Sequence, residues 1–218
     1  GVPTHYREDL LEFAWNDLDG LRACFEAHAG EVAVVMATPF DHQTGAAPAP
    51  GFFDGLRALC DRHGALFAMD DVRAGFRFHL GGSCEHWGAA PDLICYSKAI
   101  ANGHPLSAAL AREPLRAAAE RIYFTGSFFF ASGAFAAALA TLEVLERTDA
   151  IGHIRRIGGL LVDGLAEQAR RHGVPLLPTG EAAMPVIRFA DDPERGRIRR
   201  WCSIVTRGGA YAHPSHNW

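Results

Sequence analysis

The sequence predicts an α/β fold with a mainly parallel sheet, followed by a smaller α+β domain at the C-terminal end. Short, almost continuous apolar runs recur in the first part of the chain, and amphipathic stretches long enough for helices separate them. Strands that are apolar on both faces are typical of parallel sheets covered by helices on both sides. Near Asp149 this alternation gives way to long helical stretches. We therefore divide the chain into residues 1–149 and 150–218.

The first elements follow from caps and apolar runs. Asn16 or Asp17 can cap a helix that continues to about residue 28. Residues 31–37 are apolar enough to form a buried strand. A loop rich in Gly, Ala and Pro then leads to a helix over 52–63, and Gly64 marks its end because glycine readily adopts the left-handed conformation of a C-cap.

The next two strands each end at a reactive side chain. Residues 65–69 form an apolar run that leads directly into Asp70, and residues 93–96 lead through Ser97 to Lys98. Between these strands, residues 74–91 have no clear period, so we expect an irregular segment. The carboxyl ends of parallel strands meet at one edge of the sheet, where α/β proteins bind their ligands.

The remaining elements are mostly helical. In order, we expect a strand over 107–111, helices over 113–121 and 131–147, a long helix over 151–172, a strand over 186–189 and a helix over 192–207. The last three make up the smaller C-terminal domain.

The composition is that of a soluble globular protein. Of 218 residues, 49% are hydrophobic and 21% charged, and the net charge of −4 gives no reason to propose nucleic acid or an anionic membrane as a partner. No apolar run reaches the ~18 residues of a membrane span. Five cysteines without a C-x-x-C spacing are typical of reduced thiols, so we expect a cytoplasmic protein. His213 and His216 lack the companion ligands of a metal motif, and we predict no metal.

Lys98 is the only lysine among 21 basic residues. Arginine can replace lysine as a surface cation, but a guanidinium cannot form an imine, whereas an amine can. A coding bias toward arginine would explain the count equally well, and the surroundings favour a chemical role. A strand-end acid and a strand-end lysine are what a pyridoxal phosphate (PLP) site needs, since the amine holds the aldehyde and the acid pairs with the ring nitrogen.

Longer motifs around these residues resemble the class III aminotransferases. Residues 70–77 (DDVRAGFR) resemble the family signature D-E-V-x-T-G-F-R, and residues 91–108 resemble its P-D-L…K…G-G-x-P-x-G-A block. Residues 124–128 (FTGSF) resemble its G-T-x-x-G-N-P segment, with Phe129 and Phe130 near the usual G-N-P. The similarity runs along the whole chain and is greatest to proteins such as glutamate-1-semialdehyde aminomutase. It implies a PLP-dependent transferase of fold type I, with part of the large domain in residues 1–149.

The resemblance also implies roles for individual residues. Lys98 would form the Schiff base with PLP and then move a proton as general base and acid. Asp70 would keep the ring nitrogen protonated, and Val72 would pack against the ring. Ser127, or Thr125 as a competing candidate, would reach the phosphate of the neighbouring subunit's cofactor, which implies a homodimer with the active site at the subunit interface.

Asp71, residues 81–83 and Arg73 are three further positions within or near these motifs. Asp71 would hold its loop or a neighbouring polar group. Gly81-Gly82-Ser83 is similar to a phosphate cradle, but in the family this stretch is a connecting loop, and we assign it no ligand. Arg73 would bind a substrate carboxylate or form a surface ion pair, and both readings stay open.

The implied activity is transfer of an amino group between an amine or amino acid and an aldehyde or keto compound, by an aminotransferase or aminomutase. Two alternatives remain: a PLP-dependent racemase, because the same carbanion serves racemisation, and a non-catalytic scaffold. Family members have a long segment before the point that matches Gly1, and it carries the phosphate loop. We therefore expect a fragment of a larger enzyme that binds PLP weakly by itself, with a compact paralogue as the alternative.

Overall fold

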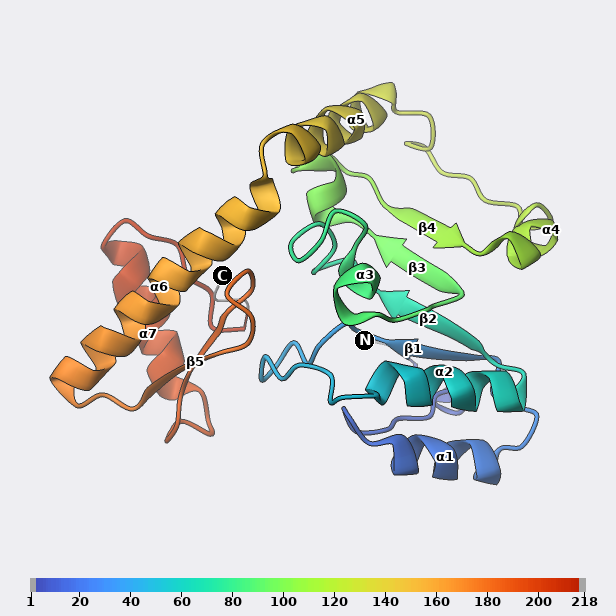
Figure 1. Ribbon diagram of the computed structural model, residues 1–218, viewed down its shortest axis with the longest axis horizontal. Coiled ribbons are helices and arrows are strands. Elements are labelled where there is room, and N and C mark those ends of the chain that lie inside the picture. The colour runs from blue at the N-terminus through green and yellow to red at the C-terminus, as the bar shows by residue number, and fades with distance from the viewer. Residues whose placement is uncertain (1–2, 216–218) are drawn as a thin grey trace.

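A four-stranded sheet forms the centre of the computed structural model, which describes residues 3–215 (Figure 1). Its strand order is β1-β2-β3-β4; the first three strands are parallel, and β4 runs antiparallel to β3. This confirms an α/β fold with a mainly parallel sheet. The strands are β1 (Val34–Ala37), β2 (Leu66–Asp70), β3 (Leu93–Tyr96) and β4 (Ala108–Ala111).

Two helices cover one face of this sheet. They are α1 (Leu18–Ala27) and α2 (Phe52–His63), and α1 begins where the Asp17 side chain accepts a hydrogen bond from the Gly20 N–H. The core between helices and strands is fully buried at Leu56 and Phe67. On the opposite face of β1 Met36 is 62% exposed, so the apolar run of this strand is covered on one side in the described part of the chain.

The elements after β2 form a second group, around β3 and β4. A short helix α3 (Ser83–Trp87) precedes β3, and a 3-10 turn η2 (Lys98–Ala101) follows it. Helix α5 (Ser132–Arg147) lies over η2, where its Ala138 packs with Ile100 and Ala101 (Figure 1). Between α4 (Arg116–Ala119) and α5 the chain forms an exposed arm over residues 120–131.

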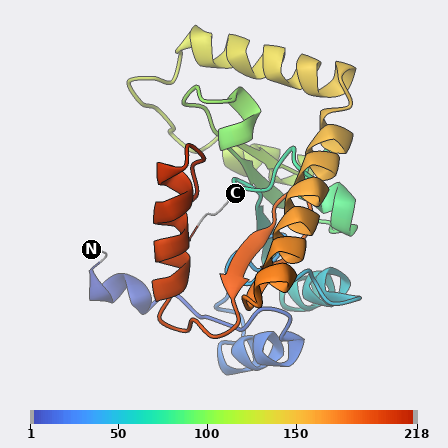
Figure 2. The same cartoon turned by 90° about the vertical axis from the view of Figure 1, so that its left-hand side faces the viewer.

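The C-terminal part has a sheet of its own. Helix α6 (Ala150–His172) is followed by the antiparallel strands β5 (Leu176–Thr179) and β6 (Val186–Phe189) and by α7 (Gly196–Arg207). In Figure 2 the two helices flank this hairpin, and Ile187 of β6 packs with Ile198 and Cys202 of α7. Asp149 caps α6 in a left-handed conformation, with φ of +47°. The division into domains at this residue stays a prediction.

Contacts between the two parts involve the turn after β1. The Thr179 hydroxyl donates to the Thr44 carbonyl oxygen at 2.6 Å. Gly45 and Gly180 meet backbone to backbone, since a β-carbon on Gly45 would lie 2.9 Å from the Gly180 Cα. Met184 also packs into an apolar cluster with Phe40 of the first part.

Two sequence-based expectations for secondary structure were wrong, and one strand was not predicted. The segment 74–91, expected to be irregular, contains α3, which Gly88 ends after five residues. The expected helix over 113–121 is instead a 3-10 turn (Glu113–Leu115), with Pro114 in its first turn, followed by α4. Strand β5 was not predicted, since its polar and proline residues give no alternating pattern.

No helix among residues 3–215 is long and apolar enough to cross a lipid bilayer.

Candidate functional site

Asp70 and Lys98 lie at the same edge of the sheet. Asp70 is the last residue of β2 and stands in register with Cys95 of β3. Lys98 is the first residue of η2, just beyond the end of β3. Because β2 and β3 are adjacent and parallel, both residues lie at the carboxyl edge of the sheet. The structure thus places the acid and the amine that the sequence singled out at neighbouring strand ends.

The backbone at Lys98 is strained. Its φ of +49° lies in the left-handed region, which costs a residue with a β-carbon on the order of 1 kcal/mol. Neighbouring contacts hold this conformation: Ile100 and Ala101 are buried beneath α5, and the Ser97 hydroxyl donates to the Leu106 carbonyl oxygen at 3.0 Å. Such strain is concentrated at functional sites, where the surrounding structure fixes a reactive group in one orientation.

The turn after β2 arranges the residues next to Asp70. The Val72 N–H donates to Asp70 Oδ1 at 3.1 Å, so the carboxylate is held by its own turn. Both Asp70 and Val72 are half-buried. Arg73 follows them; burial lowers the pKa of its guanidinium, and the nearby Asp70 charge opposes that shift. An acid, an apolar side chain and a cation therefore follow one another at this strand end.

A cavity of about 550 Å³ opens beside Lys98. Besides Lys98 it is lined by residues of the β2–α3 connection, η2, α5 and α6: Phe76, Arg77, Ala99, Asn102, Ala140, Thr141, Val144, Leu145 and Ile154. Arg77 is half-buried, its pKa is lowered by burial, and its Nε donates to the Arg73 carbonyl oxygen at 2.9 Å. Residue type and position alone indicate no role for Arg77, although it ends the motif over 70–77.

Asp71 is fully buried and holds a neighbouring loop, as the sequence predicted. Its Oδ2 accepts from the Ser83 N–H at 2.8 Å and its Oδ1 from the Ser83 hydroxyl at 2.6 Å. Burial raises the pKa of this carboxyl to about 6, the two Ser83 hydrogen bonds lower it, and the adjacent Asp70 raises it again. Both polar groups of Ser83 are therefore bound within the protein.

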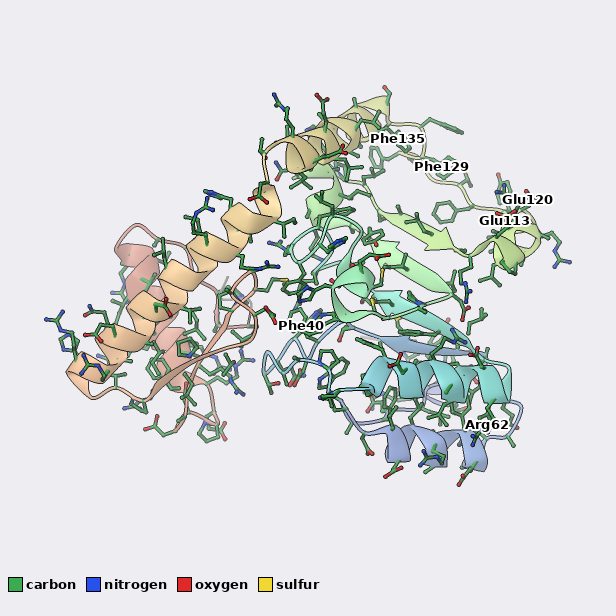
Figure 3. The ribbon with its side chains drawn as sticks, in the orientation of Figure 1. Phe40, Arg62, Glu113, Glu120, Phe129 and Phe135 are labelled. Carbon is green, nitrogen blue, oxygen red and sulfur yellow. The ribbon has the colours of Figure 1, made fainter. Side chains whose placement is uncertain are left out.

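Thr125 and Ser127 lie away from this pair, in the exposed arm between α4 and α5. Within residues 3–215 no hydrogen bond joins either hydroxyl to Asp70 or Lys98. The arm is strongly apolar, with Tyr123 91% and Phe130 84% exposed. Figure 3 shows the neighbouring Phe129 and Phe135 at the same end of the molecule.

The described part of the chain offers no group of three His, Cys, Asp or Glu side chains placed to hold a metal ion. Of the pair noted in the sequence, His216 lies outside the described residues.

Comparison with known proteins identifies the family. The family model for class III aminotransferases matches residues 5–217. The chain belongs to this family. Its relatives include both aminotransferases and aminomutases. An aminopentol aminotransferase of Sphingopyxis macrogoltabida is 41% identical over the whole chain and 52% of the relative's length. A glutamate-1-semialdehyde 2,1-aminomutase of Brevibacillus brevis is 32% identical over 97% of the chain and 50% of its own length.

Solved structures agree with this class III assignment. The FumI protein of a Sphingopyxis species, in its PLP internal aldimine form, superimposes with a TM-score of 0.94 at 41% identity, over 99% of this chain and 53% of that one. An omega-transaminase of Sphaerobacter thermophilus shares the fold, with a TM-score of 0.89 at 23% identity over 99% of this chain and 53% of its own. The chain spans about half the length of the curated relatives it matches. The fold is that of the PLP-dependent transaminases.

Class III aminotransferases use PLP, and the residues at the sheet edge fit this cofactor. Lys98 provides a primary amine, the group that an aldehyde needs, on a backbone held in an unfavourable conformation. Asp70 provides a carboxylate, the group that a pyridinium nitrogen needs, at the neighbouring strand end.

Proposed function

We propose that this chain carries the catalytic lysine and aspartate of a PLP-dependent aminotransferase or aminomutase. The enzyme would transfer an amino group between an amine or amino acid and an aldehyde or keto compound. The observation that carries the proposal is the position of Asp70 and Lys98 at one carboxyl edge in a chain of the class III family. When bound, PLP supplies an aldehyde and an electron-withdrawing ring.

Lys98 has two roles in this proposal. Its Nζ would hold the cofactor aldehyde until a substrate amine displaced it. The free amine would then serve as general base toward the proton on the substrate Cα, and as general acid when that proton is passed on. The exposed side chain has room for this exchange, while the contacts around Lys98 hold its backbone in one conformation.

Asp70 and Val72 would orient the ring. The Asp70 carboxylate would pair with the ring nitrogen and hold its proton, which would make the ring a better electron acceptor. The Val72 N–H donates to this carboxylate and fixes it, and the apolar Val72 side chain beside it would pack against the ring.

The active site would be completed by a second subunit. In this proposal the hydroxyl of Ser127, or of Thr125, would donate a hydrogen bond to the phosphate of the neighbouring subunit's cofactor. Two observations support it. Neither hydroxyl makes a hydrogen bond within residues 3–215, and both lie in an arm whose aromatic side chains are exposed. Exposed aromatic surface of this kind is typical of protein–protein interfaces.

Borohydride trapping with PLP, followed by peptide mapping, tests the proposal on the 218-residue chain and on any longer form of it. Lys98 is the only lysine in these 218 residues, so a label on its peptide has one interpretation. We expect labelling at Lys98 that is lost in Lys98→Arg and strongly reduced in Asp70→Ala. An aminopentol is the first amino donor to test, because one relative is named for it.

The control is Arg112→Lys, which places a second amine on an exposed residue outside the sheet edge. Labelling there would report adventitious reaction. A folded longer form with the phosphate loop that never labels at Lys98 would refute the enzyme proposal and favour the non-catalytic scaffold. Labelling at Lys98 with exchange of the Cα proton of an amino acid, but without amino transfer, would favour the racemase.

A further inference from the structure

The turn formed by Gly81, Gly82 and Ser83, here called the 81–83 turn, contacts both strand ends of the proposed site. On the β2 side, Ser83 donates its N–H and its hydroxyl to the Asp71 carboxylate, at 2.8 and 2.6 Å. Asp71 directly follows Asp70, and both Asp71 and Ser83 have no exposed surface. A buried carboxylate with two hydrogen bonds from one residue is a rigid connection.

On the β3 side, the same turn is bound by Tyr96. Its hydroxyl donates to the Gly81 carbonyl oxygen at 3.1 Å. Tyr96 is the last residue of β3, two positions before Lys98, and it is 7% exposed. Its ring packs against Phe76 with 5.0 Å between centroids, so the side chain cannot easily follow a displaced partner.

Gly82 lets the turn fit between these two side chains. Its φ is +93°, a conformation that L residues rarely adopt. A β-carbon at this position would lie 3.0 Å from Asp71 Oδ2 and would overlap the Tyr96 hydroxyl. The glycine backbone is thus in direct contact with both groups, and no larger residue could occupy the gap.

The turn acts where the strand ladder stops. The last paired residues of β2 and β3 are Asp70 and Cys95, and the Asp71 N–H donates to the Cys95 carbonyl oxygen at 3.0 Å. Beyond that bond the two chains separate, one toward Val72 and the other toward Lys98. The side-chain contacts of the 81–83 turn continue the connection past the end of the ladder.

We propose that the 81–83 turn fixes the spacing between Asp70 and Lys98, with Asp71 and Tyr96 as positioning residues. This proposal rests on the proposed function, in which the acid and the amine hold opposite ends of one cofactor. A displacement of about 1 Å between such groups can reduce a rate on the order of a hundredfold. The turn that resembled a phosphate cradle therefore binds two side chains of the protein itself.

Two conservative substitutions test the proposal. Tyr96→Phe removes one hydroxyl and keeps the ring, and Ser83→Ala removes one hydroxyl and keeps the N–H bond to Asp71. The first readout is the PLP concentration that gives half-maximal borohydride labelling of Lys98. Loss of one such hydrogen bond corresponds to an increase on the order of tenfold. The second readout is the pH at which the absorbance of the Lys98-bound cofactor changes, which we expect to shift in both variants.

The matched control is Asp17→Ala, which removes the cap of α1 and lowers thermal stability without touching the turn. It should leave both readouts at their wild-type values, since a general loss of stability does not alter the spacing of Asp70 and Lys98. Wild-type labelling with unchanged readouts in Tyr96→Phe and Ser83→Ala would overturn this proposal alone. A folded, wild-type longer form with the phosphate loop that never labels at Lys98 would overturn the proposed function together with it.

Discussion

Gly158, inside helix α6, provides a test in which local and tertiary effects oppose each other. Alanine is favoured over glycine within a helix by about 1 kcal/mol, so a helical Gly→Ala substitution ordinarily stabilises a protein. At Gly158, however, a β-carbon would lie 2.6 Å from the carbonyl carbon of Ala182 and would overlap its oxygen. The obstacle is backbone and cannot rotate away as a side chain does.

The next residue serves as the matched control. Gly159 lies in the same helix, and a β-carbon there meets nothing within 4 Å. Both substitutions gain the same helix propensity. The difference between the two variants in free energy of unfolding therefore isolates the contact with Ala182. Overpacking of this kind costs about 1–3 kcal/mol, and we expect the upper end because the β5–β6 connection has to move.

The measurement is urea unfolding followed by circular dichroism, with thermal unfolding as a second observation. Gly159→Ala should be more stable than wild type by about 1 kcal/mol. Gly158→Ala should be less stable than Gly159→Ala by about 3 kcal/mol, which corresponds to a difference of roughly 6–12 °C in Tm for a chain of this size. Equal stability of the two variants would refute the reasoning, because it would mean that α6 does not pack against Ala182.

Two further predictions concern carboxylates, one half-buried and one buried. The half-buried Asp92 accepts from Arg57 at 2.5 Å and from the Phe67 N–H at 2.8 Å. Asp92→Ala should therefore lower the free energy of unfolding by about 2 kcal/mol, and Asp92→Asn by less; equal losses in urea titrations would contradict this. The pKa of Asp71 is raised to about 6, so the folded protein retains a proton that the unfolded chain loses. Stability should therefore fall by about 3 kcal/mol as pH rises from ~4 to ~6, and Asp71→Asn should abolish this slope.

Much of the sheet could be predicted because its strands are short apolar runs that end at polar residues. The run before Asp70 and the run before Lys98 gave both strands and their shared edge, since parallel order follows from the alternation with helices. What escaped prediction depends on distant contacts. Strand β5 exists through pairing with β6, and helix α3 begins where Ser83 is held by Asp71. Neither contact can be recognised from a pattern in the local sequence.

The candidate site shows the same limit. A lone lysine and a strand-end acid can be recognised from residue type and position, and the family motifs support them. The 81–83 turn could not be interpreted in this way. Its glycines resemble a ligand loop in sequence, and only the structure shows that Ser83 binds Asp71 and that Gly81 binds Tyr96. A glycine-rich stretch indicates that another group lies close to the backbone, but it does not identify that group.

The backbone contact between Gly45 and Gly180 has a mechanical consequence. Two peptide segments that touch without intervening side chains, and that share the 2.6 Å bond from Thr179 to Thr44, have no flexible layer between them. We therefore expect the turn after β1 and the β5–β6 hairpin to move together. Any hinge between the sheet and the C-terminal part has to lie outside this unit, and Asp149, with its left-handed backbone at the start of α6, is one place where torsion can change.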